Sequence, residues 1–146
     1  GNNPSDLLGE RQSFTLMYGT RTTNNSTVDS FLNNTTDSYF LPQENYVYYF
    51  QSETLAVRVG GSSGSGAVGD FKAWVERGVV KNAAGTLSID RSRTSPADSG
   101  TTSGWSPINA VDGAYFKQTV KGATNMNLEW VSTIRFTQLR TNVTLT

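Results

Sequence analysis

Residues 127–144 read NLEWVSTIRFTQLRTNVT, and this stretch carries the clearest period-two pattern in the chain. Large apolar side chains occupy one parity and polar side chains the other: Leu128, Trp130, Ile134 and Phe136 against Glu129, Thr133, Arg135 and Thr137. Successive side chains of a strand point to opposite faces, so the pattern predicts a long, half-buried strand.

Weaker alternation recurs upstream. Residues 13–20 (SFTLMYGT) predict a first strand, and residues 55–59 (LAVRV) place three aliphatic side chains on one face with Ala56 and Arg58 on the other. Residues 71–80 (FKAWVERGVV) predict a further strand with Gly78 as a bulge. The face that carries Lys72, Trp74 and Glu76 is expected to point outward.

Three segments are rich in turn-forming residues. Residues 21–38 predict a loop with a short turn or helix, anchored by Val28, Phe31 and Leu32. Residues 60–66 (GGSSGSG) predict a flexible tip. Residues 91–113 form the longest polar segment and predict a loop pinned by Trp105 and Ile108.

Composition indicates the fold class. Thr, Ser, Asn and Gly are abundant, while the helix-favouring residues Lys and Glu are sparse. With 146 residues, a single domain is expected. We predict an all-β fold, an antiparallel β-sandwich of jelly-roll type with about seven to nine strands over residues 13–146, preceded by an arm or linker over residues 1–12.

Several functional classes are disfavoured by what the sequence contains. It has no Cys and no His, which removes thiolate chemistry and the side chain best suited to proton transfer near neutral pH. Twelve Lys and Arg balance twelve Asp and Glu without clustering, which does not favour nucleic-acid binding, and no apolar run is long enough for membrane insertion. We therefore predict no enzyme, with no catalytic residue, no cofactor and no metal.

Aromatic residues are the remaining candidates for ligand contact. An aromatic face can stack on a sugar ring while neighbouring polar groups bind the hydroxyls. The candidates for such contact are Tyr46, Tyr48, Tyr49, Trp74 and Trp105, and the competing interpretation is that these rings pack in the core or at a subunit contact. Leu7 and Leu8 are candidates for an assembly arm that docks on a neighbouring subunit.

The order of these segments resembles a β-sandwich domain found in tailed-bacteriophage virion proteins, including tail fibres and other tail or capsid-surface proteins. The resemblance rests on residues 71–81 (FKAWVERGVVK), a following Gly turn and residues 128–137 (LEWVSTIRFT), and it covers roughly residues 50–140. It implies a non-enzymatic domain that works in symmetric assemblies, often trimers. It supplies no functional residue that can be transferred to this chain, and residues 20–38 and 46–50 depart from the pattern.

Together these observations predict a non-catalytic structural module of a phage virion, associated with the tail or fibre. The expected partners are copies of itself, with a trimer favoured, other virion proteins and a host surface glycan. Two alternatives stay open: a capsid decoration (cement) protein that uses residues 1–12 as a clip, and a carbohydrate-binding module that works as a monomer.

Overall fold

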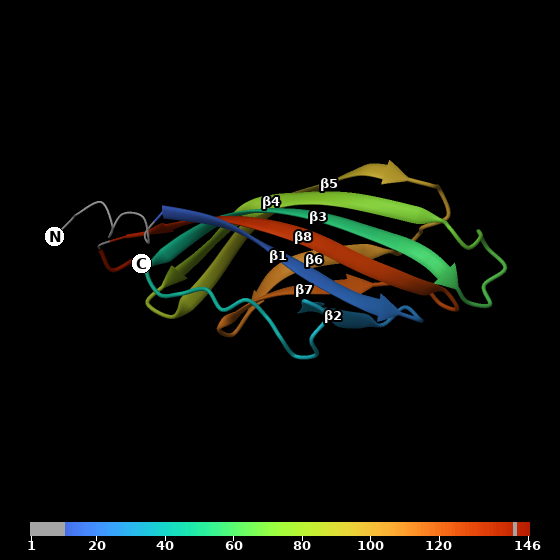
Figure 1. Cartoon of the computed structure of the whole chain (residues 1–146), viewed down its shortest axis with the longest axis horizontal. Coiled ribbons are helices and arrows are strands. Elements are labelled where there is room, and N and C mark those ends of the chain that lie inside the picture. Colours follow the sequence, from blue (N-terminus) through green and yellow to red (C-terminus); the bar gives the residue numbers. More distant parts are fainter. Residues whose placement is uncertain (1–10, 142) are drawn as a thin grey trace.

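The computed structural model describes residues 11–141 and 143–146. Within these residues the chain forms strands joined by turns and loops, with the long strands lying along the length of the molecule (Figure 1). The eight strands are β1 (Arg11–Thr22), β2 (Thr27–Leu32), β3 (Tyr46–Gly60), β4 (Phe71–Ala83), β5 (Thr86–Asp98), β6 (Ser106–Asp112), β7 (Tyr115–Lys121) and β8 (Asn127–Arg140). The prediction of an all-β fold is confirmed.

The strands belong to one antiparallel sheet, in the order β5-β4-β3-β8-β1-β2-β7-β6. The predicted two-sheet sandwich is therefore wrong: the sheet curls into a nearly closed barrel. The barrel has two walls, one formed by β5, β4, β3, β8 and β1 and the other by the short strands β2, β7 and β6. A short ladder between β1 and β2, with Tyr18 opposite Leu32 and Gly19 opposite Phe31, joins the two walls. Alternation in each strand fits both architectures, because either one gives a strand a single dry face.

The two edge strands of the sheet, β5 and β6, face each other where the barrel is nearly closed. In the part of the chain that the structure describes, no backbone ladder joins these two strands, and side chains span the gap. The Arg93 guanidinium donates to the Ser106 hydroxyl (3.0 Å) and to the Pro107 carbonyl, and the Glu76 carboxylate accepts from the Asn109 backbone N–H (3.1 Å). These bonds satisfy edge groups of β6 that an ordinary ladder would otherwise use.

Two segments expected to be loops contain the strands that decide this architecture. The segment 21–38 contains β2, which links the two walls, and the segment 91–113 contains half of β5 and all of β6. The exposed half of β5, from Arg91 to Asp98, buries no side chain and gave no apolar period. This segment is a strand because β4 supplies hydrogen-bond partners for its backbone groups, and not because of its own side-chain pattern.

Gly78, expected at a bulge, lies in regular pairing instead, opposite Phe50 of β3 and Arg91 of β5. The irregularity in the β4–β5 ladder falls between Ala73 and Val75. A Cβ atom at Gly78 would lie 2.1 Å from the carbonyl oxygen of Asp90. Glycine is therefore required at this position by the close approach of β5 to β4.

One end of the barrel interior is aromatic, and Phe136 lies at its centre. The ring of Phe136 packs against Phe40, Phe116 and Phe14, with centroid distances of 4.7, 5.2 and 5.3 Å. The Tyr18 hydroxyl accepts a hydrogen bond from the Phe40 backbone N–H (2.8 Å), and burial raises the pKa of Tyr18 to about 12. Such edge and offset contacts add to the free energy gained by burying the rings.

The other end of the interior is built on tryptophans. Trp74 and Trp130 stack with their centroids 5.5 Å apart, and Trp105, Met126 and Leu128 complete the cluster. The Trp130 indole N–H donates to the Thr22 hydroxyl (2.9 Å). The outward direction predicted for the face of Trp74 and Glu76 is wrong, because both side chains are buried inside the barrel.

A polar layer separates the two apolar clusters. The Gln118 amide donates to Thr54 (3.2 Å) and accepts from Ser132 (2.7 Å), while Thr54 and Ser132 lie 2.6 Å apart. Since Ser132 gives its proton to Gln118, Thr54 donates to Ser132 and the three groups form a closed ring of hydrogen bonds. The same Gln118 amide also donates to Asn109, whose side-chain amide donates to Glu76 (2.8 Å). Every member is paired, as burial requires.

Arg58 organises the β3–β4 loop that was expected to be a flexible tip. Its side chain is buried, and its guanidinium donates to the carbonyls of Gly60 (3.0 Å), Ser65 (2.6 Å), Gly61 (3.2 Å) and Ser63 (3.0 Å). The loop is therefore wrapped around a cation, and the spread of donors on a planar guanidinium suits this role better than a lysine ammonium would.

Candidate functional site

The outer side of β3 is unusually apolar. Its inward side chains include Tyr48, Phe50 and Ala56, so the opposite parity points to solvent. That outward parity carries Leu55, which is 41% exposed, and Val59, with Val57 half-buried between them. Aliphatic side chains at successive solvent-facing positions are more informative than single exposed ones, because monomeric proteins rarely expose contiguous apolar surface without a use.

Neighbouring strands extend this surface. Leu55 lies opposite Ala73 of β4 and Val131 of β8, and Val57 lies opposite Phe71. Directly paired residues on one face of a sheet have Cβ atoms about 5 Å apart, so these side chains form one continuous surface. We call it the outer patch, and it consists of Leu55, Val57, Val59, Phe71, Ala73, Val75 and Val131.

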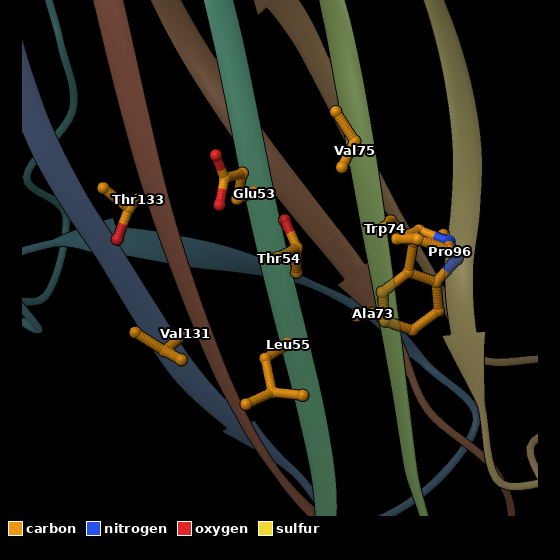
Figure 2. A pocket seen from close by; sticks show the side chains of 9 residues that line it. All are labelled: Glu53, Thr54, Leu55, Ala73, Trp74, Val75, Pro96, Val131 and Thr133. Carbon is orange, nitrogen blue, oxygen red and sulfur yellow. The ribbon is translucent and has the colours of Figure 1, made fainter.

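The outer patch contains a hollow of about 340 Å³, shown in Figure 2. Leu55, Val131 and Ala73 lie on its lower side in that view, with Glu53 and Thr133 above them. The hollow lies beside the irregularity in the β4–β5 ladder, where Pro96 is found and where the Ser95 hydroxyl donates to the Ala73 carbonyl (2.8 Å). A small residue at position 73 and a displaced edge strand together leave the space.

Polar groups border the outer patch. Glu53 and Thr133 lie along one side, and an ion pair between Arg21 and Glu129 lies along the other. A second hollow, of about 320 Å³, shares Leu55 and Val131 with the first and includes Glu129 in its lining. An apolar centre with a polar rim of both charges is the usual anatomy of a protein–protein contact surface.

Three of the predicted contact aromatics lie in the interior. Tyr48, Trp74 and Trp105 are 1%, 4% and 3% exposed, so their rings are almost fully covered by other side chains. Trp74 is nevertheless one of the residues that line the hollow in the outer patch (Figure 2). The Tyr48 hydroxyl accepts from the Gln43 backbone N–H (2.9 Å), and burial raises the pKa of Tyr48.

Trp74 and Trp105 belong to the same buried cluster, whereas the remaining predicted site residues form no exposed cluster. Tyr46 is half-buried and stacks on Tyr48 with a centroid distance of 5.7 Å, whereas Tyr49 points outward between Val79 and Thr137. Leu7 and Leu8, the candidates for an assembly arm, lie outside the described residues. The structure thus leaves Tyr49 as the exposed member of the predicted aromatic set.

The outer patch was not predicted as a site, although its alternation is visible in the sequence. The useful signal is that β3 is one strand of 15 residues. Tyr48 and Phe50 then lie on the same face of the strand as Ala56 and Arg58. Because burial of the two large aromatic rings is favourable, this whole face points into the barrel. The aliphatic parity of residues 55–59 is left on the outside.

Among residues 11–141 and 143–146, no cluster of three or more His, Cys, Asp or Glu side chains is arranged to hold a metal ion. No helix in that part of the chain is long and apolar enough to cross a membrane. The outer patch itself consists of apolar side chains, and the ionisable groups Glu53, Arg21 and Glu129 lie at its border, so it is suited to contact.

Comparison with solved structures finds similarity to phage tailspike proteins. The tailspike protein gp49 from Acinetobacter baumannii bacteriophage Fri1, described as a capsular polysaccharide depolymerase, is 7% identical with a TM-score of 0.38, and the match covers 92% of this chain and 19% of that one. The tailspike protein of Acinetobacter phage vB_ApiP_P1 is 9% identical with a TM-score of 0.39, covering 88% of this chain and 22% of that one.

The tailspike protein of Acinetobacter baumannii phage AM24 is also similar, at 10% identity and a TM-score of 0.33, with 81% of this chain and 26% of that one covered. The chain thus spans about a fifth to a quarter of the length of these proteins. No family model and no curated protein matches the chain.

Proposed function

We propose that this domain is a non-catalytic contact module of a phage virion, associated with the tail or fibre, and that copies of the chain meet through the outer patch. The observation that carries the contact role is the continuous apolar surface over β8, β3 and β4 around Leu55. The virion setting, and the expectation that the oligomer is a trimer, come from the resemblance of residues 50–140 to phage virion domains.

A second copy of the chain fits this surface for two reasons. The rim carries both charges, with Glu53 on one side and the Arg21–Glu129 pair on the other, so one copy presents partners for another. The chain has equal numbers of acidic and basic residues, so copies do not repel each other through a large net charge. Burying aliphatic side chains then supplies the favourable free energy. The absence of His and Cys from the sequence supports a non-catalytic role.

The proposal is tested by measuring molar mass with multi-angle light scattering over a range of concentrations. The wild-type chain is expected to form an oligomer, and Leu55→Asp is expected to shift it to monomer, because the contact would then bury an unpaired carboxylate. A matched control is Leu139→Asp, which alters an exposed leucine of the same outer face, 49% exposed, at the far end of β8.

Thermal unfolding should show that both variants remain folded. A wild-type chain that stays monomeric at the highest concentration measured would rule out self-association through the outer patch. An equal loss of oligomer in both variants would place the contact elsewhere on the outer face.

A further inference from the structure

The wall opposite the outer patch carries a second group of chemically distinctive residues. In the sheet order, β2, β7 and β6 lie at one end and β3 and β4 near the other, so curling brings the two groups to opposite sides of the barrel (Figure 1). Phe116 and Gln118 of β7 point inward, and their neighbours Tyr115 and Lys117 therefore point outward.

Five side chains meet on this wall in a connected arrangement. The Lys117 ammonium lies 3.1 Å from Asp112 Oδ2 and 3.6 Å from Asp29 Oδ2, and it lies 4.4 Å from the centroid of the Tyr39 ring. The Tyr39 hydroxyl donates to Asp29 Oδ2 (2.7 Å), and the Tyr39 and Tyr115 rings are 5.7 Å apart. We call these five residues the tyrosine cluster.

The internal bonds of the tyrosine cluster hold its charges in fixed positions. Hydrogen bonding to Asp112 raises the pKa of Lys117. Burial raises the pKa of Tyr39, and the nearby carboxylates of Asp29 and Asp37 raise it further. Both groups therefore keep their protons at neutral pH. Lys117 stays a cation between two carboxylates, and Tyr39 stays a hydrogen-bond donor.

Part of the tyrosine cluster is left open to solvent. Tyr115 is 43% exposed, and the Asp112 side chain is 72% exposed. All the bonds to Asp29 and Asp112 described above use Oδ2, so Oδ1 of each carboxylate has no partner among the residues that the structure describes. The competing interpretation is that the cluster only anchors the segment before β3. The bond between Tyr39 and Asp29 would be enough for that role, which leaves the exposed Tyr115 ring and the free oxygen of Asp112 unexplained.

We propose that the tyrosine cluster is a binding site for a neutral sugar. A sugar ring presents C–H groups on its face and hydroxyl donors at its edge, which match the Tyr115 ring and the free carboxylate oxygens, respectively. Two carboxylates and one ammonium leave one net negative charge within the cluster, and Asp37, which also interacts with the Tyr39 hydroxyl, adds a further negative charge beside it. This charge disfavours acidic sugars and nucleic acid. The site goes beyond the proposed self-association and does not depend on it, because it lies on the wall that the outer patch leaves free.

The site is tested by NMR titration of the full chain, following the backbone amide resonances of residues 112–117 while D-glucose, D-galactose, D-mannose and N-acetylglucosamine are added in turn. At least one probe is expected to bind. Tyr115→Ala should weaken that binding about tenfold, since it removes the stacking surface, and Asp112→Ala should do so to a similar degree, since it removes a charged acceptor.

Two further variants make the result specific. Tyr115→Phe keeps the ring and is expected to keep the affinity. Tyr49→Ala removes a tyrosine of similar exposure, 40%, from the opposite wall and is expected to have no effect. Failure of all four sugars to shift the amide resonances of residues 112–117 would overturn the proposal, as would stronger binding of alginate, an acidic polysaccharide, or of single-stranded DNA. Light scattering of Tyr115→Ala should give the molar mass of the wild-type chain. Loss of sugar binding in this variant can then be distinguished from loss of self-association.

Discussion

Strands β8 and β3 are neighbours in the sheet and both alternate, yet the parity richer in apolar side chains points inward in β8 and outward in residues 55–59 of β3. In β8, Leu128, Ile134 and Phe136 are buried, and the outward parity is mostly polar, with Val131 and Leu139 as its exposed aliphatic members. In β3, Leu55 and Val59 are exposed, while Arg58, a cation on the opposite parity, is buried. The two strands therefore show that alternation defines two faces without defining which face is inside.

The difference has a physical cause in each strand. The inward parity of β8 is filled by large rings and aliphatic groups along most of its length, so burial favours one direction. In β3 the aromatic residues Tyr48 and Phe50 fix the parity at one end, and the other end must follow because the strand is continuous. Arg58 can then be buried because loop carbonyls surround it.

The largest effect is expected from truncating the inward parity of β8. Phe136→Ala removes a buried ring that packs against several other rings and should lower the free energy of unfolding by about 3–5 kcal/mol. Urea unfolding measures the change. Thr137→Ala, the adjacent outward position, is the control and should stay within about 0.5 kcal/mol of the wild type. Similar losses in both variants would contradict the assignment of the two faces.

A smaller loss of stability is expected from replacing Arg58, the buried cation of β3. Arg58→Met keeps an apolar stem but leaves four loop carbonyls without their donor, and it should lower the free energy of unfolding by about 1–3 kcal/mol. Hydrogen exchange of the amides in residues 60–66 should accelerate at the same time. Unchanged exchange in the variant would show that the loop is held by other contacts.

The smallest effect is expected on the outward parity of β3. Leu55→Thr changes an exposed side chain on a strand that favours β-branched residues, so the free energy of unfolding of the monomer should change by less than about 0.5 kcal/mol. Measurement at low protein concentration keeps self-association out of the result. A loss comparable to that of Phe136→Ala would mean that Leu55 belongs to a core, and the outer patch would have to be abandoned as a contact surface.

The residues around the two candidate sites were predictable to different degrees. The strands that hold Leu55 and Val131 alternate between apolar and polar residues, so predicting the outer patch required only the correct assignment of the solvent-facing side of each strand. The tyrosine cluster joins residues from β2, β6 and β7 with Tyr39 from the segment before β3, and its members are separated by up to 88 positions along the chain (29 to 117). No local pattern brings such residues together, because their contact depends on the pairing of β2 with β7.

The aromatic residues illustrate the same limit. Tyr48, Trp74 and Trp105 have the composition of a sugar-stacking set, and the fold buries all three. Tyr39 and Tyr115 lie in or beside segments with little apolar period, and the fold places their rings together at the surface. Side-chain type indicates what a residue can do, whereas exposure and neighbours follow from the course of the sheet.

The sequence by itself determined the all-β class, the approximate positions of β1, β3, β4 and β8 and the two faces of each, because composition and a period of two act within single strands. Tertiary structure decided that the strands form one curled sheet, that β2 and β6 are strands, and that the aliphatic face of residues 55–59 points outward. These features depend on hydrogen bonds and packing between strands distant in the chain, where burying the aromatic and tryptophan clusters outweighs the preference of any one segment.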